Sequence, residues 1–165
     1  MDCTKNRKPF GEFRINPKTY ILLPPPHNMD QKKHIVAVTA LIKNFKGDKF
    51  LMVKRHQNEI AFAGKWAFPG GKVERKESIL ESLKREVLEE AGLDIYDEKV
   101  FLKDYTFVRP DDQNVVGMTF LVKAMNEAVK ISEDFEDFVW ISPEDLPNYD
   151  HIPGMEEEVA LAFQK

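Results

Sequence analysis

Strand-like runs alternate along the chain with two helix-like stretches. Apolar, β-branched or aromatic segments bounded by turn residues are typical of strands, and they occupy residues 34–43, 49–54, 66–68, 99–108, 115–124 and 139–141. Turn residues at 44–48 predict that the first two runs form a hairpin. Apolar positions at helical spacing follow Ser78 and recur near residues 155–163. Strands that outnumber helices in this way predict an α/β fold, an α/β/α sandwich with a mixed β-sheet between helices.

The helix that follows Ser78 carries start and stop signals in its own sequence. Ser78 and Glu81 have the spacing of a capping box, and Gly92 suits the left-handed position after the last turn. At roughly 100° per residue, a set of apolar side chains falls on one stripe about 120° wide. This stripe, which we expect to face the sheet, consists of Ile79, Leu80, Leu83, Val87 and Ala91.

The first residues of the chain differ from the rest. Residues 1–33 are mixed in character and rich in proline, and only residues 19–23 look like a strand. Because proline cannot donate a hydrogen bond to a sheet, we predict an N-terminal arm, extended or an edge strand, ahead of a single domain at 34–165. The arm could also take part in a homodimer.

Composition narrows the class of protein. With 165 residues, 42% of them apolar, the chain is long enough for one well-packed domain. A net charge of −4 argues against binding to a nucleic-acid polymer, which requires a basic surface. Cys3 is the only cysteine, so no disulfide framework is expected. Because no apolar run is long enough to span a bilayer and the first residues lack the apolar core of a signal peptide, we predict a cytoplasmic protein.

Three glutamates lie close together near the end of the predicted helix. Glu86, Glu89 and Glu90 stand at i, i+3 and i+4, so their like charges crowd one another. The helix dipole also disfavours anions at the carboxyl end. Such a triplet is usually a solvated helix face, but a divalent cation among the carboxylates would relieve the repulsion, and oxygen ligands favour magnesium, manganese or calcium.

The arrangement around these glutamates is more informative than the glutamates alone. After Gly71 come five residues, Glu77 and seven further residues, and then the run Arg85-Glu86-Val87-Leu88-Glu89-Glu90-Ala91-Gly92-Leu93. This order resembles the signature of the Nudix hydrolases, with every specified position filled. The resemblance extends upstream through residues 66–70 and, more loosely, from about residue 34 to the C-terminus.

The resemblance implies roles for the residues of the signature. Glu86, Glu89 and Glu90 would hold one to three Mg²⁺ or Mn²⁺ ions, with the Gly70 carbonyl joining the metal shell. Arg85 would orient Glu86. Glu77 would brace the glycine turn or reach a metal through water.

Further residues outside the signature are implied less directly. Arg55, at the end of a strand, is a predicted substrate contact, as are Gly71 and Lys72 in the glycine turn. The alternative for Arg55 is an arginine that snorkels at a strand end, and the alternative for Lys72 is a solvated charge. The loop before the last strand offers Glu133 and Glu136 as a metal ligand or catalytic base, and the sequence does not choose between them. Residues 148–151 could line a pocket for a base.

The implied activity is a metal-dependent attack of water on a nucleoside diphosphate linked to another group. Our leading hypothesis is a pyrophosphohydrolase that converts nucleoside triphosphates to monophosphate and pyrophosphate, because residues 66–72 and the modest length look similar to the MutT-like branch. An ADP-ribose or nucleotide-sugar pyrophosphatase is the second hypothesis. A non-catalytic nucleotide-binding module is the third, and the intact carboxylates count against it. No membrane partner is expected.

Overall fold

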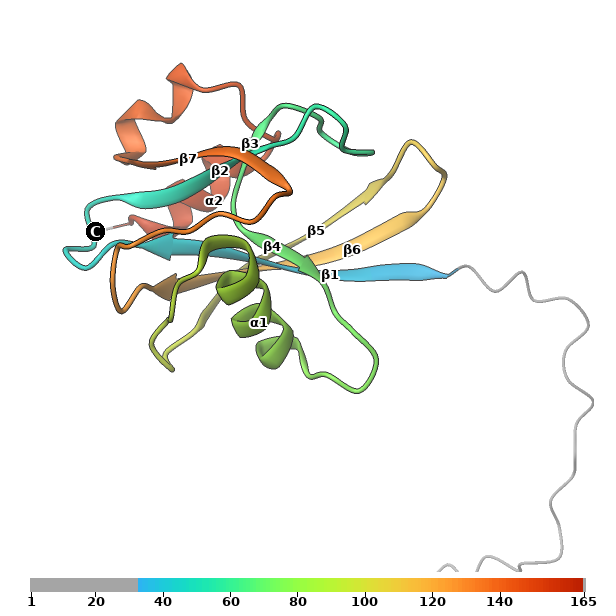
Figure 1. The fold of residues 1–165 in the computed structure, drawn as a ribbon, viewed down its shortest axis with the longest axis horizontal. Coiled ribbons are helices and arrows are strands. Elements are labelled where there is room, and N and C mark those ends of the chain that lie inside the picture. Colours follow the sequence, from blue (N-terminus) through green and yellow to red (C-terminus); the bar gives the residue numbers. More distant parts are fainter. Residues whose placement is uncertain (1–32, 165) are drawn as a thin grey trace, which may run out of the picture. The chain divides into compact units, whose positions relative to one another are not determined.

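The structure of the protein, a computed structural model, describes residues 33–164 and contains one seven-stranded mixed sheet (Figure 1). The predicted N-terminal arm lies outside the described residues, apart from residue 33, so it stays a prediction. None of the helices within residues 33–164 has the length and apolar character needed to cross a membrane.

A parallel pair of long strands forms the middle of the sheet. Strand β1 (His34–Lys43) pairs along its whole length with β6 (Asn114–Lys123), and this is the parallel pairing of the mixed sheet. The remaining strands join antiparallel to one another or to this pair. They are β2 (Phe50–Arg55), β3 (Trp66–Ala67), β4 (Gly70–Lys72), β5 (Val100–Val108) and β7 (Phe135–Ile141).

Two strand predictions need correction. The predicted hairpin meets only at its turn, where Lys43 pairs with Phe50, because the length of β1 is taken up by β6 and β4. Strand β7 begins at Phe135, four residues before the predicted start at 139. Its acidic first half looks like a loop in sequence, but Asp137 pairs with Lys54 of β2, where a basic strand end faces it.

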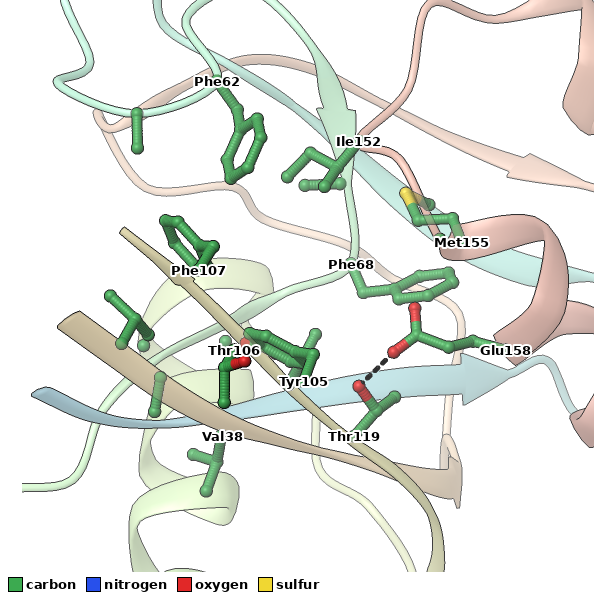
Figure 2. Close-up of a pocket in the computed structure, with 18 of the residues that line it drawn as sticks. Val38, Phe62, Phe68, Tyr105, Thr106, Phe107, Thr119, Ile152, Met155 and Glu158 are labelled. Carbon is green, nitrogen blue, oxygen red and sulfur yellow. Dashed lines mark hydrogen bonds between the residues drawn. The ribbon is translucent and has the colours of Figure 1, made fainter. Parts of the chain in front are cut away.

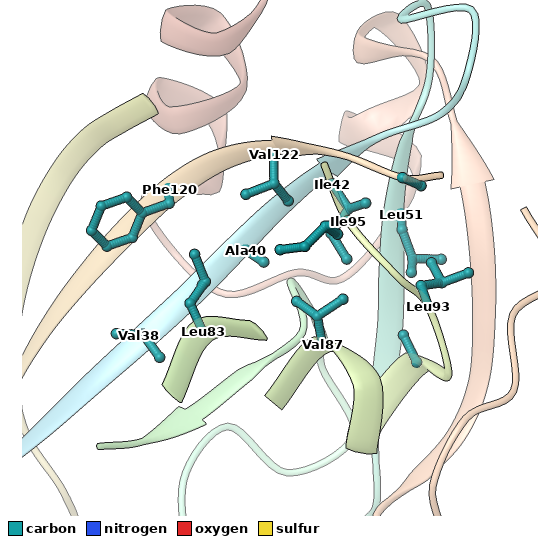
Figure 3. Packing of buried hydrophobic residues seen from close by; sticks show 12 residues of the cluster. Val38, Ala40, Ile42, Leu51, Leu83, Val87, Leu93, Ile95, Phe120 and Val122 are labelled. Carbon is teal, nitrogen blue, oxygen red and sulfur yellow. The ribbon is translucent and has the colours of Figure 1, made fainter. Parts of the chain in front are cut away.

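The helices cover opposite faces of the sheet, which confirms the predicted α/β/α sandwich. Helix α1 (Ile79–Ala91) packs on one face with Val38, Ala40 and Ile42 of β1 (Figure 3). Helix α2 (Met155–Ala162) packs on the other face with Leu41. A 3₁₀ helix, η1 (Pro143–Asn148), precedes α2. Alternation along β1 therefore divides its side chains between the two layers.

The predicted caps of α1 are confirmed, but its buried face differs in part. Ser78 and Glu81 form both hydrogen bonds of the capping box, and Gly92 has a φ of 65°. Leu80, expected to be buried, is 46% exposed, whereas Ser82 and Glu86 are buried. The short strand β4 lies against α1 on the Glu86 side, so polar positions of the helix turn inward there and Leu80 is left in solvent.

Candidate active site

Two glycines of β4 allow its backbone to run closely between β1 and α1. Gly70 has a φ of +155°, and a Cβ atom there would lie 2.2 Å from the Val38 carbonyl oxygen. A Cβ atom at Gly71 would lie 2.4 Å from the carboxyl group of Glu86. Because neither position has room for a side chain, the glycine turn brings the carboxylates of α1 directly against the backbone of β4.

Glu90 is held on the amide of this turn. The Gly70 amide donates a 2.6 Å hydrogen bond to the carboxylate of Glu90. Burial raises the pKa of Glu90 to about 8, against the effect of this hydrogen bond, and the negative charges of Glu86 and Asp134 raise it further. An ionised Glu90 therefore lacks sufficient positive charge around it.

Arg85 binds three carboxylates and one carbonyl at once. Its Nε and Nη2 donate to the two oxygens of Glu77 at 2.9 and 3.0 Å, and its Nη1 donates to Glu86 at 2.8 Å and to Glu89 at 3.0 Å. Nη2 also donates to the Lys72 carbonyl oxygen at 3.0 Å. The planar guanidinium thus ties the glycine turn, the loop before α1 and α1 itself into one unit.

Glu77 is the anchor of this network. Hydrogen bonds from Arg85, and then from the Ser82 hydroxyl at 2.7 Å, lower the pKa of Glu77 to about 2. Glu77 therefore stays ionised down to strongly acidic pH, and its attraction keeps the guanidinium aimed at Glu86. The roles of Arg85 in orienting Glu86 and of Glu77 in bracing the turn stay predictions.

The three glutamates of the predicted triplet lie in different environments. Glu86 is buried, and burial raises its pKa, while the side chain of Glu89 is 59% exposed. Within residues 33–164, no three histidine, cysteine, aspartate or glutamate side chains are gathered closely enough to hold one metal ion. Arg85 draws Glu86 and Glu89 to one side, whereas the Gly70 amide holds Glu90.

Glu86 and Glu90 nevertheless fit a hard divalent cation by their chemistry. Burial raises the pKa of both carboxylates, and the negative charge of Glu86 raises the pKa of Glu90 further. The last turn of α1 contains no basic residue that would balance them against the helix dipole. A cation with oxygen ligands would remove this repulsion, and the roles of Glu89 and of the Gly70 carbonyl as further ligands stay predictions.

The acidic loop before β7 crosses the end of α1. The Ser132 amide donates to the Glu90 carbonyl oxygen at 3.1 Å. Glu133 is exposed, and Glu136 lies in β7 rather than in the loop, where it pairs with Lys54 at 2.9 Å. Asp134, which the sequence analysis did not single out, is the loop carboxylate whose charge raises the pKa of Glu90. The predicted roles of Glu133 and Glu136 stay predictions.

A cavity of about 450 Å³ opens on the other side of the glycine turn, on the α2 face of the sheet (Figure 2). Arg55, Gly71 and Lys72, the three predicted substrate contacts, all line this cavity. Gly70, a predicted metal ligand, lines it too. Arg55 Nε donates to the Ala61 carbonyl oxygen at 3.1 Å, and Arg55 also pairs with Glu59. Arg55 is therefore held in place by its own loop.

The deeper wall of the cavity comes from elements far apart in the sequence. Phe62, Tyr105, Phe107 and Met155 contribute apolar surface, and Thr119 and Glu158 contribute a polar pair (Figure 2). Residues 148–151, predicted as the lining of a base pocket, do not line this cavity, and the following segment from Ile152 to Met155 lines it instead. Tyr149 instead packs edge-on against Trp66, with 5.3 Å between ring centroids.

Glu158 was missed in the sequence, although a signal for it exists. Counted from Met155 as position i, Glu158 is at i+3 of the buried stripe of α2. The other buried positions of this stripe, Val159 at i+4 and Ala162 at i+7, are apolar. A charged residue in such a stripe indicates a special environment, whereas its neighbours Glu156 and Glu157 are exposed. Because Glu158 follows two other glutamates, the sequence alone does not distinguish this buried residue from its exposed neighbours.

Comparison with known proteins gives consistent results. A family model described as NUDIX domain matches residues 33–161. Nucleoside triphosphatase NudI of Escherichia coli is 34% identical over an alignment of 122 residues, and the match covers 68% of this chain and 85% of the relative. The MutT protein of Methanosarcina mazei has a similar structure, with a TM-score of 0.67 and 29% identity over 80% of this chain and 94% of that chain.

A more distant structure shares the fold alone. The NUDIX domain of Shewanella oneidensis NrtR, complexed with ADP ribose, has a TM-score of 0.66 and 20% identity, covering 79% of this chain and 87% of that chain. The region matched by the family model contains every residue of the predicted site.

Proposed function

This chain belongs to the Nudix family of hydrolases, and we propose that it hydrolyses ribo- or deoxyribonucleoside triphosphates to the monophosphate and pyrophosphate. One observation carries the proposal. Two desolvated carboxylates, Glu86 and Glu90, contact the same glycine turn that lines a cavity of about 450 Å³. Ligand sites commonly have volumes of about 300–1,000 Å³, and this cavity suits a nucleoside whose phosphates lie at the turn.

Different residues of the chain would have different roles in this reaction. Glu86 and Glu90 would hold a divalent cation, Mg²⁺ or Mn²⁺, with Glu89 and the Gly70 carbonyl as additional ligands. When bound, the cation would neutralise the phosphate oxygens and make water a better nucleophile. A carboxylate, either Glu86 or one from the loop before β7, would take the proton from the attacking water. Asp134 joins Glu133 of that loop and Glu136 of β7 as a candidate, because the charge of Asp134 raises the pKa of Glu90.

The similarity to NudI supports a triphosphate over the alternatives. NudI is described as a nucleoside triphosphatase. The shared fold of the NrtR domain carries no argument for ADP-ribose, since that similarity shows the fold alone. The intact Arg85 network with Glu77 and Glu86 supports catalysis over nucleotide binding alone.

A substrate panel tests this proposal. The panel contains ribo- and deoxyribonucleoside triphosphates, ADP-ribose and a nucleotide sugar, each with Mg²⁺ and with EDTA. We expect a monophosphate and pyrophosphate from at least one triphosphate, and no product in EDTA; anion-exchange chromatography identifies the products. If the preferred reaction is hydrolysis of ADP-ribose to AMP and ribose 5-phosphate, the protein is an ADP-ribose pyrophosphatase and our assignment is wrong. If no compound in the panel is hydrolysed, the hypothesis of a non-catalytic binding module remains.

Replacing Arg85 by lysine is expected to lower kcat with little change in KM. Lysine keeps the charge, but its ammonium cannot bind both oxygens of Glu77 while it reaches Glu86. We expect kcat to fall about 10–100-fold, because misplacement of a catalytic group by about 1 Å has effects of this size. Steady-state kinetics measure the change, with Arg75→Lys at an exposed position as the matched control. A wild-type kcat in Arg85→Lys would remove the positioning role.

A further inference from the structure

The cavity wall contains a buried carboxyl group that the reaction described above does not use. Glu158, on α2, is only 8% exposed, and its Oε1 accepts a 2.5 Å hydrogen bond from the Thr119 hydroxyl (Figure 2). No other hydrogen bond to the Glu158 carboxyl exists among residues 33–164. Burial raises its pKa, since one hydroxyl donor does not replace the water that it has lost.

The positive charge available to Glu158 is also engaged elsewhere. Lys103 is the positive group that acts on it, but the ammonium of Lys103 pairs with Glu157, the exposed neighbour of Glu158 on α2. A buried acid with one donor destabilises a fold compared with an apolar side chain in the same position. The second oxygen of Glu158 therefore has an unused capacity to accept a hydrogen bond from something that enters the cavity.

The strand register gives the separation between the phosphate end of the cavity and Thr119, the hydrogen-bond partner of Glu158. Gly70 pairs with Thr39, Thr39 pairs with Thr119, and Thr119 pairs with Lys103, so these residues form one row across four strands. Thr119 lies two strand spacings from Gly70, about 10 Å. This separation matches the reach of a nucleoside from its phosphate to the far edge of its base.

Aromatic side chains make the space between these two ends suitable for a flat ring. A Cβ atom at Gly117 would lie 2.0 Å from the Tyr105 ring, so this ring lies across β6 and its hydroxyl reaches Thr39 at 2.7 Å. Phe107 lies beside Tyr105, with 6.3 Å between ring centroids, and contacts Phe62 at 5.2 Å. Planar bases stack favourably on such surfaces.

We propose that Glu158 accepts a hydrogen bond from the exocyclic amino group of the nucleobase, so that the enzyme prefers amino bases to their keto counterparts. This proposal rests on the nucleotide substrate proposed above. An amino group supplies the donor that the carboxylate lacks. A carbonyl oxygen at the same position would face the carboxylate with a second set of lone pairs and leave both groups unpaired. Thr119 holds the acid in this orientation.

Two pairs of substrates that differ only in this group test the proposal. CTP differs from UTP, and ATP from ITP, by an amino group in place of a carbonyl oxygen. In the pair that the enzyme accepts better, we expect kcat/KM to favour the amino member by about 10–100-fold. Glu158→Leu should bring the ratio close to one, and Glu158→Gln, whose amide can also donate, should reduce it. Glu144→Gln, at an exposed position of η1, is the control for removal of one negative charge and should keep the wild-type ratio.

Binding measurements separate failure of this proposal from failure of the proposed function. Calorimetric affinities for CMP against UMP, and for AMP against IMP, need no hydrolysis. A preference for the amino member that Glu158→Leu removes supports the role of Glu158 even if no triphosphate is cleaved. Equal affinities in wild type, a preference for the keto member, or a preference unchanged in Glu158→Leu would overturn it, whether or not triphosphates are hydrolysed.

Discussion

Glu90→Gln is expected to abolish hydrolysis while making the metal-free protein more stable. The amide of glutamine has nearly the same shape and can still accept the hydrogen bond from the Gly70 amide, so the local fold should be kept. It has no charge to hold a cation among the carboxylates. We expect kcat/KM to fall by about 10³-fold or more, in line with the loss of an electrostatic contribution to catalysis.

The stability effect depends on pH, and its sign follows from the raised pKa of Glu90. The pKa is about 8 in the folded protein and 4.5 as an ordinary value, so the folded state binds more protons than the unfolded state between these two pH values. Stability of the metal-free wild type should therefore fall as pH rises through this window. Glu90→Gln removes the dependence, and at pH 8 it should be more stable by on the order of 4 kcal/mol, since one pKa unit corresponds to about 1.4 kcal/mol.

Urea denaturation in EDTA at about pH 5 and about pH 8 measures this effect. Mg²⁺ should stabilise wild type and leave Glu90→Gln unchanged, because only wild type offers the second carboxylate to the ion. Glu98→Gln, at an exposed position, is the control for removal of one negative charge. Wild-type activity in Glu90→Gln, or no stabilisation of the wild type by Mg²⁺ or Mn²⁺ even with nucleotide, would contradict the assigned metal site.

Gly70→Ala is expected to cost both stability and activity. The added methyl group would meet backbone atoms of β1, 2.2 Å from the Val38 carbonyl oxygen and 2.7 Å from the Thr39 Cα, and strands cannot move apart as a side chain can. The φ of +155° adds backbone strain. We expect the free energy of unfolding to fall by about 3–5 kcal/mol, as for other substitutions that combine overpacking with strain.

Gly47→Ala is the matched control for this substitution. Gly47 also has a positive φ, 81°, but a Cβ atom there has no atom within 4 Å. The strain of the left-handed backbone alone should therefore cost about 1 kcal/mol. Denaturation curves of both variants separate the cost of the steric clash with β1 from the cost of backbone strain. The kcat/KM of Gly70→Ala should also fall, because the Gly70 amide positions Glu90. Equal stability losses in the two variants would mean that β4 can move away from β1.

Local signals in the sequence predicted the elements that build the site. The capping box at Ser78, the αL glycine at position 92 and the strand runs each depend on residues within a few positions of one another, and all are present in the structure. The spacing from Gly71 to Glu90 also identified the glycine turn and the carboxylates together. Short-range interactions of this kind are encoded by neighbours in the chain, so they are readable without the fold.

Helical periodicity located one face of α1 but did not determine which edge of it is buried. Leu80 and Glu86 lie on opposite sides of the stripe centred on Leu83 and Val87, and hydrophobicity favours burying the leucine. The structure buries Glu86 instead, because β4 approaches the helix on that side and Arg85 satisfies the carboxylate. The same close approach places the carboxylate of Glu86 against the glycine turn.

What the sequence determined by itself was the set of local pieces: the two helices, most strands, the glycine turn and the presence of acidic residues beside it. The tertiary structure alone decided which distant residues share the cavity. Thr119 and Glu158 are 39 residues apart, and Thr39 and Tyr105 are 66 apart. Their contacts depend on the parallel pairing of β1 with β6 and on the packing of α2 across the sheet, which no local pattern specifies, because long-range contacts form only when the whole sheet is assembled.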